Sequence, residues 1–440
     1  MTANMTTMAV EPRDTLSVGV VGAGYVGLTS AACLAHLGHR VACVDVDHTK
    51  IAALRRGRVP IAEPGLVELV RQGTAEGRLT FHTDHGPFAD TDVVLVCVPT
   101  PMGVDGAADL DALHSAVRSI GATLRPGCVL VVKSTVPVGT TRDLEKVLDR
   151  GDIPVVSNPE FLREGRAVED FLNPDRVVVG SDDEVAADAI DRLYRRLPGT
   201  MLRTDPPTAE LAKYACNAFL AMKLSYVNAL AELCGRVGAD IDGVTAAMSL
   251  DNRIGPAFLS SGPGWGGSCL PKDVAALLSC AGRAGVDLGM VREALTANDG
   301  RIERTARRIT ALAGGSVAGV RIGLLGLTFK ADTDDLRRSP AVGVAELLAA
   351  AGARLTAYDP AVPSTTSDTP RSIRVVDDPI LVADGAAVVV VLTEWTRFTG
   401  LDWPAMAART DRATVLDTRR LLDRTAIEAA GWTYRLIDAD

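Results

Sequence analysis

Residues 15–27 read Thr-Leu-Ser-Val-Gly-Val-Val-Gly-Ala-Gly-Tyr-Val-Gly, an apolar strand that runs directly into a glycine-rich turn. Helical sequence follows from Leu28 to about Leu37, and a second apolar strand, residues 40–45, ends in Asp45. Glycines permit a tight turn and close approach of the backbone to a pyrophosphate, whose charge a helix N-terminus favours. Because strand, turn, helix, strand and acid occur together, they predict a dinucleotide-binding βαβ unit more strongly than a lone GxGxxG would.

The end of this unit indicates which dinucleotide binds. A carboxylate about 20 residues beyond the turn accepts hydrogen bonds from ribose hydroxyls. Asp45 and Asp47 would repel a 2′-phosphate, and no arginine lies beside them. The sequence therefore predicts NAD rather than NADP.

Alternation of strands and helices continues, with further apolar strands expected over residues 91–98, 127–134 and 153–157. Ligands of an open α/β sheet bind beyond the carboxyl ends of its strands. The polar residues that follow these ends are Thr100, Thr135, Glu160 and Glu164. Each is either a site residue or an ordinary turn or helix-cap residue.

Size and composition set outer limits. A chain of 440 residues is expected to form two or three domains. A net charge of −9 with mixed signs argues against a nucleic-acid partner, and no apolar run approaches membrane-spanning length. The eight cysteines have neither paired nor metal-binding spacing, which favours reduced thiols, a cytoplasmic setting and no metal. Residues 1–13 lack signal-peptide features and are expected to be a disordered tail.

A long helical pattern occupies the middle of the chain, from residues 205–208 to Cys234. Such a helix suits a connection between two domains. Lys213 and Asn217 are four residues apart and therefore share a face. Lys213 is either a solvated cation or, among apolar neighbours, an oriented charge. Asn217 carries a propensity cost inside a helix, which favours a side-chain role.

A second glycine-rich stretch is followed by a cysteine. Residues 264–273 read Gly-Trp-Gly-Gly-Ser-Cys-Leu-Pro-Lys-Asp. Pro271 can occupy the first turn of a helix, so Cys269 is expected beside a helix N-terminus, where the thiolate is favoured. The alternative is a buried, inert cysteine. Asp273 is either a functional acid or simply an acid that suits the first helical turn.

A second strand-turn-helix pattern begins near Gly319 and predicts another doubly wound domain. Its turn carries Phe329 in place of the last glycine, so it is not expected to hold a dinucleotide in the same pose. Lys330 in that turn and Arg419, after a strand at residues 414–417, offer cations for a different phosphate.

These features together resemble the UDP-glucose/GDP-mannose dehydrogenase family, from residue 16 to about residue 437. The motifs that carry the resemblance are residues 22–27, 133–137, 158–164, 213–217, 266–273 and 329–330. Residues 173–180 and 253–259 resemble the branch that acts on UDP-glucose. Ser260 stands where some members carry a lysine, which changes one secondary sugar contact and leaves the chemistry untouched.

The resemblance implies an α/β fold in which a long central helix and a small helical domain join two doubly wound, Rossmann-like domains. The implied domains are 14–203 for NAD, 204–300 for the central helical and dimerisation domain with Cys269, and 316–440 for the UDP-sugar.

The resemblance also implies a reaction, the four-electron oxidation of UDP-glucose to UDP-glucuronate with two NAD molecules in succession. An aldehyde yields no hydride until a nucleophile adds to it, and Cys269 would add, giving a thiohemiacetal and then a thioester. Lys213, supported by Asn217, would stabilise the oxyanions. Asp273 and Thr135 would hold a water, with Glu164 as base.

The resemblance also implies which residues contact the cofactor and which contact the substrate. Residues expected to contact NAD are Gly22, Gly24, Tyr25, Val26, Gly27, Asp45, Lys50, Pro99, Thr100, Thr135 and Lys272. Residues expected to contact UDP-glucose are Glu160, Phe161, Leu162, Glu164, Lys213, Asn217, Arg253, Phe258, Gly266, Lys330 and Arg419. Arg253 would reach the nucleotide of a neighbouring subunit, which implies at least a homodimer.

Three alternatives stay open. The same oxidation on GDP-mannose or a UDP-hexosamine would use the same residues. A two-electron hydroxyacid dehydrogenase of the 6-phosphogluconate type also pairs a helix lysine with an asparagine, but it needs neither Cys269 nor a third domain. A sugar-nucleotide-binding or scaffold protein would have no need of Cys269, Lys213 and Asp273 together.

Overall fold

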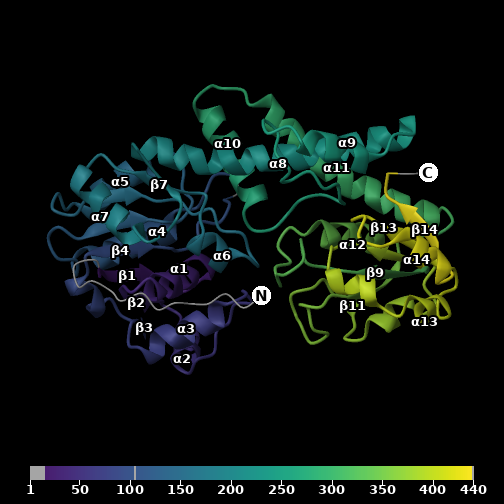
Figure 1. The fold of residues 1–440 in the computed structure, drawn as a ribbon, viewed down its shortest axis with the longest axis horizontal. Helices are drawn as coiled ribbons and strands as arrows, with labels where there is room; N and C mark the ends of the chain where they lie inside the picture. Colours follow the sequence, from purple (N-terminus) through teal and green to yellow (C-terminus); the bar gives the residue numbers. More distant parts are fainter. Residues whose placement is uncertain (1–14, 104–105, 439–440) are drawn as a thin grey trace. The chain divides into compact units, whose positions relative to one another are not determined.

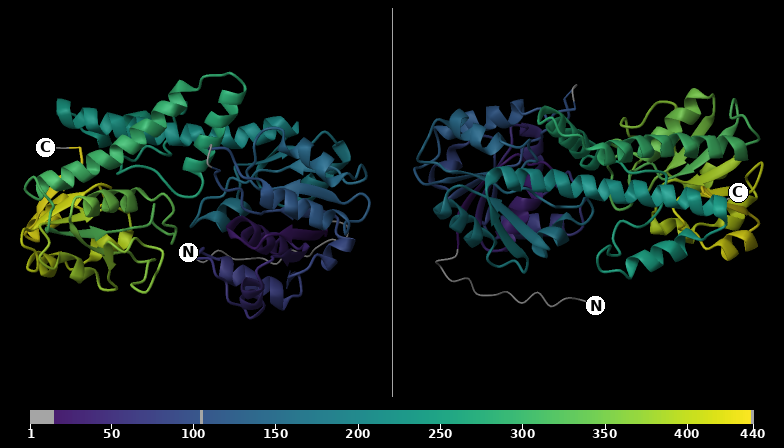
Figure 2. Two further views of the ribbon diagram at one scale, coloured as in Figure 1. Left: turned by 180° about the vertical axis from the view of Figure 1, so that it is seen from behind. Right: turned by 90° about the horizontal axis from the view of Figure 1, so that it is seen from above.

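The computed structural model describes residues 15–103 and 106–438, so the expected tail at residues 1–13 lies outside the described residues. The chain divides into two compact units after Ala215, and each unit is built on one open sheet (Figure 1). The division falls within helix α8, Pro206–Val237, which Figure 2 (right) shows as one uninterrupted teal helix. The sequence predicted this helix, with an end at Cys234.

The first unit contains an eight-stranded sheet in the order β3-β2-β1-β4-β5-β6-β7-β8. All neighbours are parallel except β6 and β7, which pair antiparallel. The order of the first six strands is that of a dinucleotide-binding fold, in which the chain reverses direction across the sheet between β1 and β4. The strands are β1 Ser17–Val21, β2 Arg40–Val44, β3 Leu79–His82, β4 Val93–Val96, β5 Val129–Val132, β6 Val155–Ser157, β7 Arg176–Gly180 and β8 Thr200–Thr204.

Helices cover both faces of this sheet. Val18 and Val20 of β1 belong to one buried cluster with α1, α3 and α7, whereas Val94 and Val96 of β4 belong to another with α4 and α5. Strands buried on both faces are continuous apolar runs, which is why the sequence shows them so clearly. The helices are α1 Tyr25–His36, α2 His48–Arg55, α3 Leu66–Ala75, α4 Asp111–Gly121, α5 Thr140–Leu148, α6 Ala167–Leu172 and α7 Glu184–Tyr194, with a short 3₁₀ helix at Gly86–Asp90.

The second unit contains a six-stranded, wholly parallel sheet in the order β11-β10-β9-β12-β13-β14, which repeats the order of the first six strands. Ile322 and Leu324 of β9 pack towards α11 and α12, whereas Val389 and Val391 of β12 pack on the opposite face with Trp403. The strands are β9 Arg321–Leu325, β10 Arg354–Tyr358, β11 Ile373–Val375, β12 Val388–Val391, β13 Thr414–Asp417 and β14 Thr433–Leu436. The helices packed on them include α12 Pro340–Ala350, α13 Trp403–Ala407 and α14 Arg424–Ala429, and 3₁₀ helices occupy Pro379–Ala383 and Thr396–Gly400.

Between α8 and this sheet the chain is helical, with α9 Ile241–Ser249, α10 Leu270–Arg283 and α11 Gly289–Leu312. Helix α10 begins as expected, since Cys269 is its N-cap and Pro271 lies in its first turn. The fold is therefore the predicted one, with two doubly wound sheets and a long central helix. No helix within the described residues has the length and apolar character needed to span a membrane.

The two sheets differ in what their first turn offers a ligand. Gly22 and Gly326 follow β1 and β9 with φ of 95° and 97°, and each donates its amide to the end of the neighbouring strand. In the second unit the carboxylate of Asp359, after β10, accepts the Leu327 and Thr328 amides at 2.7 and 3.0 Å. It also accepts from the Trp395 indole at 3.2 Å. Asp45 accepts the Ala23 amide in the same way, so the Thr328 amide and the Trp395 indole are donors to Asp359 that have no counterpart at Asp45 among the described residues.

Candidate active site

The glycine-rich turn has the geometry that a dinucleotide requires. A Cβ on Gly27 would lie 1.9 Å from the carbonyl oxygen of Gly22, so helix α1 can cross β1 this closely only with glycine there. Gly24 is the N-cap of α1, and a Cβ there would meet nothing within 4 Å. Within the described residues no side chain caps this helix, so its first amides point to a ligand site.

Asp45 lies at the carboxyl end of β2 as an ionised group. Its carboxylate accepts from the Ala23 and Asp47 amides at 2.7 and 2.9 Å and from Nζ of Lys50 at 2.9 Å. Burial alone would raise the pKa of Asp45, but these donors, the Asp47 amide foremost, hold the pKa below its ordinary value. Two residues expected at the cofactor, Asp45 and Lys50, are thus together at the edge where a ribose would lie.

The loops after β4 and β5 are joined at the same edge of the sheet. Thr100 Oγ1 donates to the carbonyl of Thr135 at 2.7 Å, and Ser134 Oγ donates to the carbonyl of Val98 at 2.7 Å. Pro99 lies between these contacts. The structure therefore brings Pro99, Thr100 and Thr135 together, although they come from separate strands.

Lys213 is not a solvated cation. Its Nζ lies 3.1 Å from Oε1 of Glu160, and the two side chains are 4% and 7% exposed. The same Nζ lies 5.2 Å above the ring of Phe161. Burial would raise the pKa of Glu160, but Lys213 and the Leu162 amide, which donates at 2.6 Å, hold that pKa below its ordinary value. The predicted residues Lys213, Glu160, Phe161 and Leu162 thus form one cluster.

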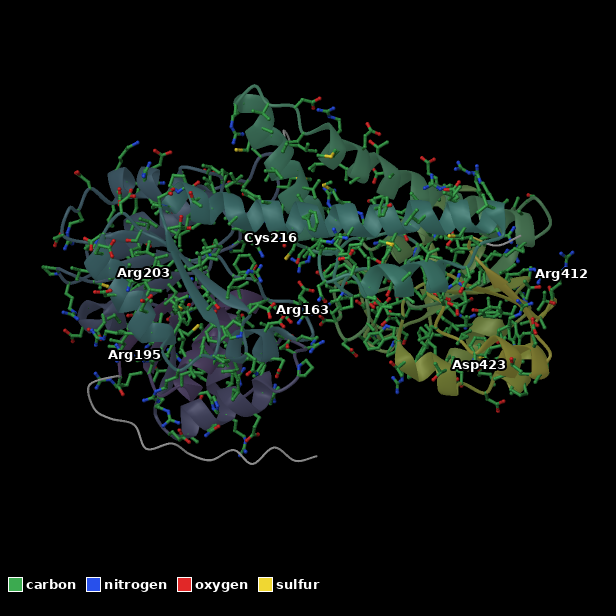
Figure 3. All side chains as sticks on the ribbon, turned by 45° about the horizontal axis from the view of Figure 1, so that its top comes forward. Arg163, Arg195, Arg203, Cys216, Arg412 and Asp423 are labelled. Carbon is green, nitrogen blue, oxygen red and sulfur yellow. The ribbon has the colours of Figure 1, made fainter. Side chains whose placement is uncertain are left out.

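A buried carboxylate that the sequence did not single out connects the turn to this cluster's loop. The Tyr25 hydroxyl donates to Glu63, and the Gly165 amide lies 2.7 Å from Oε2 of Glu63 and 2.8 Å from the Tyr25 oxygen. Burial, with Glu63 next, raises the pKa of Tyr25, so the hydroxyl stays a donor. Glu164, the expected base, precedes Gly165 in this loop. Arg163, labelled in Figure 3, pairs with Asp170 instead.

Lys133 is a second buried lysine that sequence reasoning placed in a motif but not in the site. Its Nζ donates to Oδ1 of Asn158 at 3.1 Å, and that oxygen also accepts from the Tyr194 hydroxyl at 2.7 Å. Burial lowers the pKa of Lys133 to about 8. The available signal was the scarcity of lysine in a chain with 46 basic residues, most of them arginine.

In the second unit, the thiol of Cys269 lies at the N-terminus of α10, with Ser268 Oγ 3.5 Å from its sulfur. Asp273, one turn into this helix and 1% exposed, accepts from Asn217 Nδ2 at 2.5 Å. Lys272 Nζ lies 2.6 Å from its other oxygen. Asp273 is therefore the acid of the first helical turn, and it contacts two other predicted site residues; its functional role stays a prediction.

The loop before Cys269 packs against the turn after β9. A Cβ on Gly266 would lie 2.0 Å from the carbonyl oxygen of Arg338, and one on Gly267 would lie 2.9 Å from the Phe329 ring. Arg419 Nη2 donates to the carbonyl of Phe329 at 3.3 Å, and Lys330 Nζ lies 5.7 Å from the Phe329 ring centroid. Gly266, Lys330 and Arg419 therefore lie around one turn.

Two predicted contacts lie elsewhere in the second unit. Arg253 pairs with Asp251 at 2.6 Å, and its side chain is 89% exposed. Phe258 has a φ of 61°, in a loop whose carbonyls at Ile254 and Ala257 accept from Lys223 at 3.1 and 2.7 Å. An exposed arginine is compatible with a contact to another subunit. Within the described residues no group of three His, Cys, Asp or Glu side chains could hold a metal ion.

A nucleotide-binding turn, a buried lysine–glutamate pair and a thiol at a helix N-terminus are together typical of a nucleotide-dependent dehydrogenase, and the second unit adds another doubly wound sheet. The chain belongs to the UDP-glucose/GDP-mannose dehydrogenase family, as the motifs indicated. The NAD binding domain of that family matches residues 16–198, its central domain residues 207–300 and its UDP binding domain residues 323–424. The protein is thus an NAD-dependent oxidoreductase.

Named relatives are similar over almost the whole chain. A UDP-glucose 6-dehydrogenase of Rhizobium meliloti (strain 1021) is 42% identical over 96% of this chain and 99% of its own. UDP-glucose 6-dehydrogenase TuaD of Bacillus subtilis (strain 168) is 37% identical over 96% and 92%. Among solved structures, a UDP-glucose dehydrogenase from Pyrobaculum islandicum has a TM-score of 0.89 at 35% identity, covering 98% of this chain and 100% of that one.

Proposed function

We propose that this protein oxidises UDP-glucose to UDP-glucuronate in two successive two-electron steps. The observation that carries the proposal is Cys269 at the N-terminus of α10, next to the Asp273–Asn217 pair. An alcohol dehydrogenase that stops at the aldehyde has no need of a thiol. A thiol makes the second oxidation possible, because it converts the aldehyde into an adduct that again carries a hydride. The similarity to UDP-glucose 6-dehydrogenases supports the choice of sugar.

The residues of the first unit fit the cofactor, since the turn is open at Gly24 and Asp45 is ionised at the ribose edge. Two NAD molecules, bound in succession, would each accept one hydride, one for each oxidation. The first oxidation removes a hydride from the sugar C6 and releases the hydroxyl proton to solvent, leaving an aldehyde. In this proposal Lys213 faces the C6 oxygen and stabilises negative charge on it. Glu160 orients Lys213 through the ion pair at 3.1 Å.

Cys269 then adds its sulfur to the aldehyde carbon, and the oxygen gains a proton, giving a thiohemiacetal. Loss of the second hydride and of that proton gives a thioester. Water held by Thr135 and Asp273 attacks the thioester, gives a proton to Glu164 and releases the thiolate. The proposal requires Lys213 and Cys269 to act on one carbon. Lys213 and Asn217 are four residues apart on α8, and Asn217 donates a hydrogen bond to Asp273.

The domain roles follow the same proposal. We assign residues 14–203 to NAD, 204–300 to the helical middle and 316–440 to the UDP-sugar, where Lys330 and Arg419 would meet the nucleotide. All eight cysteines are free thiols, which supports a reducing, cytoplasmic setting.

A substrate panel tests the function. We expect purified protein to reduce NAD with UDP-glucose at a kcat/KM at least about 100-fold above GDP-mannose and the UDP-hexosamines, since buried polar groups left unpaired by the wrong sugar cost this much or more. NADH formation followed at 340 nm measures it. A preference for another nucleotide sugar would change the assigned substrate but keep the reaction. NADH formation from a hydroxyacid and from none of the nucleotide sugars would reject the proposed function.

We also propose a homodimer that packs along α8. Phe219, Tyr226 and Leu233 are 61%, 58% and 53% exposed, and Val237 is 67% exposed. Spacings of seven and four residues place these side chains in one stripe along the helix. An exposed apolar stripe marks an interaction surface, and a second copy of this chain offers the same stripe in return.

Placing a charge in this stripe is expected to separate the subunits. Tyr226→Lys would put an ammonium group into an apolar contact, and we expect the variant to sediment as a monomer while the wild type sediments as a dimer or larger assembly. Val185→Lys, on α7 at 79% exposure, is the matched control and should sediment as the wild type does. A monomeric wild type, or a dimeric Tyr226→Lys, would contradict the interface.

A further inference from the structure

A buried carboxylate on α8 caps a helix of the nucleotide domain. Glu210 is 2% exposed, and its two oxygens accept three hydrogen bonds from the start of α5. The donors are the amides of Gly139 and Thr141, at 2.6 and 2.7 Å, and the hydroxyl of Thr141 at 2.6 Å. The N-cap of α5 is Gly139, which has no side chain of its own to satisfy these amides.

The cap is a directed interaction rather than a chance contact. The first amides of a helix have no acceptor within the helix, and its N-terminus carries a partial positive charge. A carboxylate with both oxygens engaged there is held in position as well as in orientation. Burial raises the pKa of Glu210, and the three donors oppose this rise. A serine or aspartate at the N-cap position would be enough to stabilise the start of α5, so stability alone does not require a buried acid from α8.

The position of Glu210 relative to two candidate site residues, Lys213 and Thr135, suggests a reason for this buried acid. Lys213 follows Glu210 by three residues on α8, which is less than one helical turn. Gly139 ends the loop that begins after β5 and carries Thr135. The carboxylate therefore links the turn of α8 that bears Lys213 to the loop that bears Thr135.

We propose that Glu210 is a positioning residue, which fixes Lys213 of α8 relative to the Thr135 loop through the N-terminus of α5. The inference rests on the proposed function, because it assigns Lys213 a task at the sugar oxygen. Glu210 itself does not touch the reacting atoms. Its effect on turnover must therefore pass through Lys213.

A double-mutant cycle tests this dependence. We expect Glu210→Gln to lower kcat about 10- to 100-fold with an unchanged KM for NAD, since small displacements of a reacting group cost this much. In a Lys213→Met background the same change should lower the residual kcat less than about twofold, because coupled residues are not additive. Equal fold-losses in both backgrounds would overturn the inference and leave the proposed function intact.

Milder variants at Thr141 test the same interaction if Glu210→Gln folds poorly. Thr141→Val removes one of the three donors and is expected to give an intermediate loss, whereas Thr141→Ser keeps all three and should behave as wild type. Glu145→Gln, an exposed acid on the same helix α5, is the matched control and should change nothing. A Thr141→Val enzyme with wild-type kcat would count against the inference.

Hydrogen exchange separates this inference from the substrate assignment. Glu210→Gln should speed exchange in the peptide that contains Lys213, and Glu145→Gln should not. The double-mutant cycle is measured with whichever nucleotide sugar the wild type oxidises. It can therefore be interpreted even if that sugar is not UDP-glucose. A wild type that oxidises none would reject the proposed function, and unchanged exchange at Lys213 would reject the positioning role.

Discussion

Replacing Cys269 with alanine is expected to lower steady-state NADH formation at least about 1,000-fold, since removal of a covalent nucleophile has effects of this size or larger. The wild type should form about two NADH for each UDP-glucose consumed, because the thiol makes the second oxidation possible on the same bound sugar. The alanine variant retains Lys213 and the cofactor turn, so it can form at most one NADH and an aldehyde. Single-turnover absorbance at 340 nm measures the yield.

Serine at position 269 separates addition from hydrolysis. Its oxygen can add to the aldehyde to give a hemiacetal, and loss of the second hydride to NAD and of a proton then gives an ester. This ester hydrolyses less readily than a thioester in a site arranged for sulfur. We expect this variant to stall with a covalent sugar adduct, visible as a mass increase of the intact protein. Cys280→Ser, on the same helix α10, is the control and should turn over as the wild type does. Unchanged turnover in Cys269→Ser would contradict the covalent route.

The parts of the site that follow strand ends could be predicted from the sequence. Asp45 and Thr135 are visible because a continuous apolar run precedes each of them, and parallel strands bring such ends to one edge of the sheet. Cys269 is visible because small residues and a proline mark the helix start locally. In each case the signal lies within about ten residues of the functional group.

The buried acids that hold these parts together could not be predicted in this way. Glu63 meets Tyr25 and Gly165 from 38 and 102 residues away, and Glu210 meets Thr141 across 69 residues. Such pairings depend on tertiary packing, and no local pattern distinguishes Glu63 or Glu210 from a solvated glutamate. Asp359 has the same place after β10 as Asp45 has after β2, and each carboxylate accepts an amide of the neighbouring turn. The Trp395 indole, a further donor to Asp359, comes from a distant part of the chain and could not be predicted from the local pattern.

Replacing Lys213 with methionine is expected to lower kcat about 100- to 1,000-fold, the usual loss when one oxyanion donor is removed. Arginine should restore little of it, since a planar guanidinium cannot place its charge where a compact ammonium lies. NADH formation under saturating substrate measures both variants. Lys146→Met removes a lysine whose side chain is 77% exposed and is expected to have no effect.

The ion pair with Glu160 lets catalysis be separated from stability. Lys213→Met leaves a buried carboxylate without its closest cation, which costs about 3–5 kcal/mol of unfolding free energy for pairs of this kind. The pKa of Glu160, now held below its ordinary value by Lys213, should rise, so the variant loses stability most where that carboxyl must stay ionised, towards high pH. Adding Glu160→Gln removes the unpaired charge and should recover most of the stability without recovering turnover. Denaturant unfolding and kcat are measured on the wild type, on Lys213→Met and on the double variant Lys213→Met/Glu160→Gln. If the role of Lys213 were purely structural, the double variant would regain activity together with stability.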